Sequence, residues 1–386
     1  MKLLALAFAA ALFAGAAGSA QAATIRGLPF PAGATIDTEA GSPAVTANAH
    51  GVVAASLALP SGGRIVVWDA TGHATVLQPP PGGQYDDPRT ASTEEAVVAP
   101  DDTVYGNGAY PFSGAYSGVR KRLYAWRHGV PVAINGTACA SGASDAHPTF
   151  VAPDGRLALA GSYDSDVMNI DAIESGGMPP TASVLDGAVC RVLDFGWISA
   201  LDGGFAAGHR GYLNGKPFPP NANAQQQTYV AVRWTGAHAQ EIGPGVALGV
   251  NARGDCAGAD APPGIHGAII IGRSGPEGTE RHEYKIGDMH ALVWHGATMT
   301  RLSPMARRSI AYAINESGRT AAGTLFDDTG QHAVRWRDGK AQLLDSLLPR
   351  DAGWRLLVAY AITPDGAIAG VGRHNGALAA FVLSAD

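Results

Sequence analysis

A segment with one pattern recurs seven times along the chain, and this recurrence restricts the fold more than any other feature. Each copy is a short apolar stretch that ends in a turn carrying Gly or Asp. The turns of the seven copies end at Gly51, Asp102, Gly155, Gly203, Gly254, Gly318 and Gly366. The mean spacing between consecutive copies is about 52 residues, and a period of this size indicates a protein built from repeated supersecondary units.

Each unit holds enough sequence for four short strands. Small residues follow the turn, as in Ala322-Gly323, and we expect them where strands crowd near a central axis. A third apolar stretch ends in Trp in five units, at Trp68, Trp126, Trp234, Trp294 and Trp336, whereas Leu185 and Leu383 take this place in units three and seven. We expect these Trp side chains to cover one unit against its neighbour. A fourth short stretch, such as residues 341–344, completes the unit.

Four short strands in each of seven units predict an all-β chain folded as a seven-bladed β-propeller. The 51 Gly and 25 Pro residues indicate many tight turns, and no segment has a convincing helical period. The chain ends on residues 380–383, which correspond to the third strand of a unit and lack the fourth strand that would pair with them. We expect residues 34–38 near the N-terminus to supply that partner and close the ring between the two ends of the chain. An open solenoid is the alternative, because a regular period does not prove closure.

Units five and six resemble the bacterial extracellular repeat named HAF after its His-Ala-Phe strand. Unit six reads Ala311-x-x-Ile314-Asn315-x-x-Gly318, then His332-Ala333-Val334-x-Trp336, and unit five reads His290-Ala291-Leu292-x-Trp294. The resemblance is clear over about residues 247–386 and weak before them. It implies an exported repeat protein with a propeller-like build. It carries over no catalytic residue, because the recurring positions look structural.

The N-terminal segment, residues 1–22, has the features of a secretory signal peptide. Lys2 precedes an apolar run from Leu3 to Ala17, and Ala20-Gln21-Ala22 fits the small-x-small cleavage pattern. A retained anchor is the alternative, but the run is short for a bilayer span. We therefore predict a single propeller domain over residues 23–386, located in the periplasm or secreted, with no membrane span in the mature chain.

Export permits disulfide formation, and the chain has three cysteines. Cys139 and Cys190 lie one repeat apart, so we expect them to occupy equivalent places in neighbouring units and to form a disulfide. Cys256 would then remain free. Three unpaired, mostly buried thiols are the alternative.

Units two to five carry insertions between their second and third strands. The segment from the turn to the end of the third strand is short in units one, six and seven, where it covers 51–68, 318–336 and 366–383. The same segment is longer in units two to five, where it covers 102–126, 155–185, 203–234 and 254–294.

Four adjacent long loops on one face predict a binding site for a carbohydrate or protein ligand, such as a glycan, a peptide or an envelope partner. The alternative is a merely solvated set of polar loops. Candidate ligand-binding residues are Tyr116, Arg120, Tyr163, Asp164, His209, Arg210, Tyr212, Arg273 and His282.

Other functions receive less support from the sequence. A net charge of -6 without a long basic run excludes a nucleic-acid footprint. No cofactor is predicted, apart from a weak calcium site at Asp164, Asp166, Asn169 and Asp171, whose spacing departs from an EF-hand. The alternative function is a polysaccharide lyase or glycoside hydrolase that uses acid and base residues from the same loops. Its candidate catalytic residues are His266, His282, Glu277 and Tyr163. A purely structural or assembly role is the third hypothesis.

Overall fold

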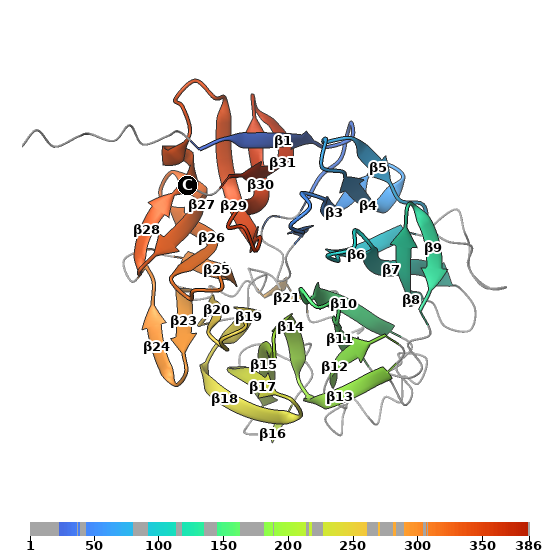
Figure 1. Ribbon diagram of the computed structural model, residues 1–386, viewed down its shortest axis with the longest axis vertical. Helices are drawn as coiled ribbons and strands as arrows, with labels where there is room; N and C mark the ends of the chain where they lie inside the picture. The colour runs from blue at the N-terminus through green and yellow to red at the C-terminus, as the bar shows by residue number, and fades with distance from the viewer. Residues whose placement is uncertain are drawn as a thin grey trace, which may run out of the picture.

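The fold is known from a computed structural model that describes most of the chain from Ala23 onward. The described residues are 23–36, 38, 44–79, 92–112, 118–134, 145–162, 181–187, 189–213, 216–217, 227–260, 269–270, 281–282, 289–303, 306 and 308–384. Within these ranges the structure is built from strands, and the one helical element is a 3-10 turn, η4 (Leu344–Leu347). The strands form blades around a central axis (Figure 1).

Seven antiparallel sheets, which we call blades one to seven, make up the ring. Blade one consists of β2 (Val45–Ala47), β3 (Val53–Leu59), β4 (Gly62–Trp68) and β5 (Ala74–Val76). Blade two consists of β6 (Ser92–Val98), β7 (Val104–Phe112), β8 (Gly118–Arg127) and β9 (Val130–Ala133). Blade three consists of β10 (Asp145–Val151), β11 (Leu157–Ser162), β12 (Thr181–Asp186) and β13 (Val189–Phe195). Blade four consists of β14 (Trp197–Asp202), β15 (Phe205–Leu213), β17 (Gln227–Thr235) and β18 (His238–Pro244), with β16 (Lys216–Pro217) beside β15. Blade five consists of β19 (Val246–Val250), β20 (Cys256–Ala259), β23 (Ala291–His295) and β24 (Thr298–Arg301). Blade six consists of β25 (Arg308–Ile314), β26 (Thr320–Asp327), β27 (Gly330–Arg337) and β28 (Lys340–Leu343). Blade seven consists of β29 (Trp354–Ile362), β30 (Ile368–His374), β31 (Ala377–Leu383) and β1 (Ile25–Pro29).

The architecture is the predicted seven-bladed β-propeller. Each of the seven repeated apolar stretches overlaps the first strand of a blade, and these first strands lie nearest the axis (Figure 1). A separate two-stranded ribbon, β21 (Ile269–Ile270) with β22 (Arg281–His282), belongs to the insertion of blade five.

The strand that completes blade seven differs from the expectation. β1 pairs with β31 from Ile25 opposite Leu383 to Pro29 opposite Ala379, so the partner is residues 25–29 and not residues 34–38. Thr35 instead forms an isolated bridge with Ala58 in blade one. The physical reason is that Leu28 is fully buried in the same apolar cluster as Trp68. The two ends of the chain therefore share one blade.

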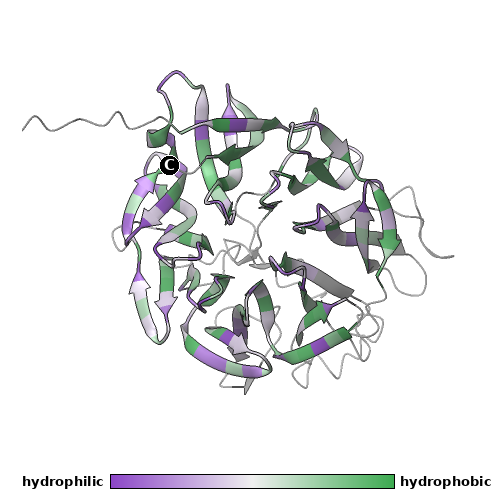
Figure 2. Ribbon diagram, viewed as in Figure 1, coloured by the Kyte–Doolittle hydropathy of each residue, from purple (hydrophilic) through white to green (hydrophobic). Residues whose placement is uncertain are grey.

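The Trp residues that end the third strands link each blade to the preceding one. All five are at most 1% exposed. Trp126 in blade two donates its Nε1 hydrogen to the carbonyl of Gln78, which follows blade one, at 3.4 Å. Trp336 in blade six donates to the Ser303 hydroxyl, after blade five, at 2.7 Å. Hydrophobic residues run along the strands within the blades (Figure 2). Trp126 belongs to one apolar cluster with Ile65 of blade one, and Trp234 to one with Ala158 of blade three, so the expected packing of Trp between neighbouring blades is confirmed.

Small residues in the second strands have a more specific cause than crowding at the axis. The first strands of blades four to seven contain a β-bulge, and a glycine of the second strand lies opposite it. A Cβ atom at Gly323 would lie 1.8 Å from the carbonyl oxygen of Ile310. The equivalent contacts at Gly208, Gly258 and Gly370 would be 1.8 to 2.0 Å. Only glycine permits this approach of the two backbones.

Candidate functional site

An axial cavity of about 670 Å³ lies where the first strands of the blades converge. Every blade contributes to its lining, through residues that include Val45, Val98, Phe150, Asp202, Leu248, Tyr312 and Tyr360 in blade order. The turns after the first strands also line it, so the cavity reaches the face of the ring on which those turns lie. Its volume is in the range of small-molecule sites, which is about 300–1,000 Å³.

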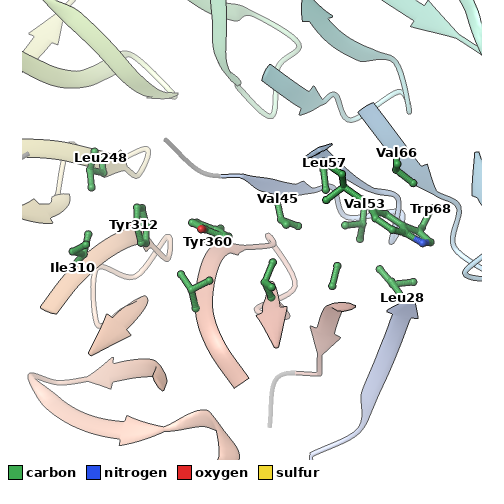
Figure 3. Packing of buried hydrophobic residues seen from close by; sticks show 14 of the residues in the cluster. Leu28, Val45, Val53, Leu57, Val66, Trp68, Leu248, Ile310, Tyr312 and Tyr360 are labelled. Carbon is green, nitrogen blue, oxygen red and sulfur yellow. The ribbon is translucent and has the colours of Figure 1, made fainter. Parts of the chain in front are cut away.

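The inner wall of the cavity is largely apolar and aromatic. Tyr312 and Tyr360 lie side by side near the axis, with Leu248 and Val45 on either side of them (Figure 3). The two tyrosine rings have centroids 5.0 Å apart and planes at 60°. Both residues are 2% exposed and belong to the cluster that contains Leu248 and Val45. The two rings are therefore packed into the core beside the cavity and offer almost no surface to its open space.

The mouth of the cavity holds a pair of carboxyl groups from blades four and six. Asp202 ends β14 and is buried, whereas Glu316 lies on the exposed turn after β25. Burial, followed by the hydrogen bond and negative charge of Glu316, raises the pKa of Asp202 to about 7. The Asp202 carboxyl group is therefore partly protonated near neutral pH.

Asp202 has no ion-pair partner among the described residues. Arg156 is close enough to affect it electrostatically, but the Arg156 guanidinium contacts Asp154 at 2.7 Å and also donates to the carbonyl of Gly203. Asp154 itself adds negative charge that raises the pKa of Asp202. A buried carboxyl group without a direct ion-pair partner is costly when ionised, which agrees with the raised pKa of Asp202.

Arg210 and Tyr212, two of the predicted ligand-binding residues, lie together on the side of blade four that faces blade three. The Arg210 guanidinium pairs with Asp194 and lies 3.6 Å from Glu241, and it is 4.2 Å from the centre of the Phe195 ring. The Tyr212 hydroxyl donates to Glu241. Arg210 is engaged within the protein, and its visible role is to join the outer strands of blades three and four.

His209 points to the other side of β15, because successive side chains of a strand alternate. Its ring packs edge-on against Tyr229 at 5.7 Å. Burial lowers the pKa of His209 to about 4, so the imidazole is neutral at physiological pH. The structure thus does not bring His209 into contact with Arg210 or Tyr212.

The remaining predicted site residues cannot be placed in a described site. Arg120 lies in β8 and His282 in β22, where only the backbone is described. Outside the described residues lie Tyr116, Tyr163, Asp164, Asp166, Asn169, Asp171, His266, Arg273 and Glu277. The calcium site and the loop site remain predictions. Within the described part of the chain, no three His, Cys, Asp or Glu residues form a group that could hold a metal ion.

The cysteines have different states. Cys190 is disulfide-bonded, and Cys139 lies outside the described residues, so the pairing between them stays a prediction. Cys256 is free and buried, and burial raises the pKa of its thiol to about 12. Such a thiol is protonated and unreactive.

The recurring His of the repeat has a structural role. His290 in blade five lies 3.1 Å from Asp260 through Nδ1, and its backbone nitrogen donates to the same carboxylate at 2.7 Å. Arg301 also donates to Asp260, at 3.1 Å. In blade six, the equivalent His332 contacts a different acidic residue, Asp327, through Nε2 at 3.2 Å. In blade five this contact joins the two sides of the hairpin where the insertion begins and ends.

The axial carboxyl pair and the strand ends from which the insertions leave lie on opposite faces of the ring. The insertions leave from the ends of the second strands, whereas the turns that line the cavity mouth precede those strands. Because neighbouring strands are antiparallel, these two sets of strand ends lie on different faces. The sequence analysis missed the pair, although the acidic residues in its repeated turns were the available signal.

Comparisons with known proteins assign the chain to no family. No family model matches the chain, and no curated protein matches its sequence. Several solved structures are similar at low identity. A gluconolactonase from Xanthomonas campestris is 12% identical with a TM-score of 0.38, and the match covers 96% of this chain and 92% of that one. The polysaccharide lyase Uly1 is 8% identical with a TM-score of 0.41 and 90% of each chain covered. A Hadza microbial sialidase is 11% identical with a TM-score of 0.40, covering 89% of this chain and 65% of that chain.

These similarities concern the fold alone. No helix within the described ranges is both long enough and apolar enough to cross a membrane.

Proposed function

We propose that the protein is an exported binding module and that its axial cavity holds the ligand. The observation that carries this proposal is the cavity of about 670 Å³, which residues of all seven blades line and which has a buried carboxyl group at Asp202. A concave apolar site with few, specific polar groups is the usual form of a small-molecule site. Export and membership of the HAF-repeat family belong to the proposal and rest on the sequence.

The insertions of blades two to five provide a second surface for the same function. We propose that they recognise a glycan, a peptide or an envelope partner, as their aromatic, amide and charged residues suggest. Deleting residues 163–174 and 273–288 would abolish binding at this surface and leave the axial cavity intact. Binding that survives both deletions would contradict a role for these loops.

An enzyme is the second candidate function, and one observation favours it. The pKa of Asp202 is near 7, which suits a general acid or base. Incubation with a polysaccharide panel, followed for reducing ends and for unsaturated products, would test it. Product formation that is lost in Asp202→Asn would establish the enzyme.

The binding proposal is tested by filling the cavity. Ala361 lines it and is half-buried, so Ala361→Phe places a ring in the open space. Ala341→Phe makes the same change on the exposed outer strand of blade six and serves as the control. Benzylammonium, benzyl alcohol and benzoate are the probes, followed by calorimetry and thermal melting. The proposal expects at least one probe to bind the wild type and Ala341→Phe but not Ala361→Phe. Failure of all three, or binding insensitive to Ala361→Phe, would overturn it.

A further inference from the structure

We propose that the axial cavity binds a neutral carbohydrate unit, whose hydroxyl groups bond to polar residues at the mouth and whose apolar ring face packs against Phe150. This inference rests on the proposed function and names the class of ligand. It combines three features of one cavity: lining charges of both signs, an arginine without a partner among the described residues, and a partly exposed aromatic residue.

The charges that line the cavity do not select an ion of either sign. They are the carboxyl groups of Asp202, Glu316 and Asp365 and the guanidinium groups of Arg335 and Arg337. Near Asp202, the further charges of Asp154 and Arg156 contact each other at 2.7 Å. A simple cation or anion would meet a like charge in this lining, whereas a hydroxyl group can donate to a carboxylate and accept from a guanidinium. A zwitterion is the other ligand that suits mixed charges, and it is included in the experiment below.

Blade six supplies hydrogen-bonding groups that are open to a ligand. Arg337 ends β27, is exposed, and forms no hydrogen bond or ion pair with any residue that the structure describes. Glu316 is exposed on the turn after β25. The shape of this turn is fixed, because Asn315 Oδ1 accepts hydrogen bonds from the Ser317 hydroxyl and the Thr320 backbone nitrogen, both at 3.0 Å. A guanidinium donor and a carboxylate acceptor can each bond to a different hydroxyl group of one sugar.

Phe150 of β10 supplies apolar surface to the cavity. It lines the cavity and is partly exposed. It also packs against the apolar clusters that join blade three to blade four and blade four to blade five, so its position is fixed. The C–H groups on one face of a sugar ring are apolar, and an aromatic ring offers them contact area. Tyr312 and Tyr360 take no part, because they are 2% exposed and belong to the core cluster (Figure 3).

The experiment measures affinities for the full mature chain by calorimetry. Phenyl β-glucoside, phenyl β-galactoside and phenyl α-mannoside are compared with benzyl alcohol, benzylammonium and benzoate, and phenylalanine is the zwitterion. All of these probes carry one phenyl ring. We expect at least one glycoside to bind at least tenfold more tightly than benzyl alcohol and phenylalanine. Its affinity should change less than twofold between about 50 and 500 mM NaCl, because salt does not screen the interactions of a neutral ligand as it screens those of an ion.

Two substitutions test the residues that carry the inference. Arg337→Ala should lower the affinity for that glycoside at least fivefold and leave benzyl alcohol affinity within twofold. Lys340→Ala is the matched control, because it removes an exposed cation from β28 of the same blade, outside the cavity lining, and it should change neither affinity. Phe150→Leu keeps an apolar side chain without the ring and should also weaken the glycoside at least fivefold. Thermal melting of each variant verifies that a loss of binding is not a loss of folding.

The outcomes separate this inference from the proposed function. If no glycoside binds more tightly than benzyl alcohol, and benzyl alcohol is blocked by Ala361→Phe, the carbohydrate inference is wrong and the binding function stands. Tighter binding of phenylalanine than of any glycoside would overturn the inference in favour of a zwitterion. Glycoside affinity that changes in neither Arg337→Ala nor Phe150→Leu would overturn it as well. If none of the probes binds the wild type, both proposals are wrong.

Discussion

Asn251 in blade five donates its side-chain amide to the backbone carbonyl of Asn315 in blade six, across 2.9 Å. The Asn251 side-chain oxygen accepts hydrogen bonds from the backbone nitrogens of Arg253 and Asp255, both at 3.0 Å. One fully buried side chain therefore closes its own turn and holds the turn of the next blade. Asn48 makes the same kind of link from blade one to the Ala99 carbonyl of blade two, at 2.8 Å.

Replacing Asn251 with Ala should destabilise the protein by about 2–3 kcal/mol, because buried backbone groups of two turns lose their partners. Chemical denaturation measures the free energy of unfolding. Thr300→Ala on the exposed outer strand of blade five is the control and should stay within about 0.5 kcal/mol of the wild type. If Asn251→Ala lowers the free energy of unfolding by less than Thr300→Ala does, water replaces the hydrogen bonds of the lost amide.

Replacing Gly323 with Ala should destabilise the fold by about 3 kcal/mol or more, because the new methyl group cannot avoid the carbonyl oxygen of Ile310 without moving a strand. Gly204 lies in a turn, and a methyl group added there would have no heavy atom within 4 Å, so Gly204→Ala is the matched control. Thermal melting of the two variants compares them directly. Similar melting temperatures would show that the bulge in blade six is not rigid.

The sequence analysis succeeded where the chain repeats and failed where unique contacts decide the structure. The repeat period located all seven first strands and the buried Trp positions, because each blade packs against its neighbours in a similar way. The prediction for the strand that completes blade seven was wrong. Residues 25–29 take that place, where Leu28 is buried and the Arg26 guanidinium donates to the carbonyls of Gly51 and Ala70. The pair of Asp202 and Glu316 joins different blades, and no local pattern encodes that meeting.

The stability of the protein should depend on pH through Asp202. Its pKa is about 7 when folded and near 3.8 when unfolded, so the folded state binds more protons between these values. The free energy of unfolding from this group therefore falls as the pH rises from about 4 to 7. Asp202→Asn should remove that fall and stabilise the protein by about 1–2 kcal/mol at pH 8 relative to pH 4, after allowance for solvent screening. Denaturation at several pH values compares the variant with the wild type, and parallel curves would contradict the prediction.

Removing β1 should expose an unpaired strand in blade seven. A chain that begins at Phe30 lacks the partner of β31 and also loses Leu28 from the core, so we expect aggregation and a lower melting temperature. A chain that begins at Ala23 keeps the strand and should stay monodisperse. Light scattering and thermal melting test both chains. Equal behaviour would show that another segment can cover the edge.

The contact between Asp260 and His290 ties together the two chain segments from which the insertion of blade five departs. The blade's own sheet is complete on the near side of that contact, since β20 pairs with β23 from Cys256 opposite Trp294 to Ala259 opposite Ala291. The pairing of β20 with β23 therefore uses no residue beyond this contact. This makes the hairpin a natural grafting point, where a foreign recognition peptide or a whole reporter domain can replace residues 261–288 while the ring keeps its shape.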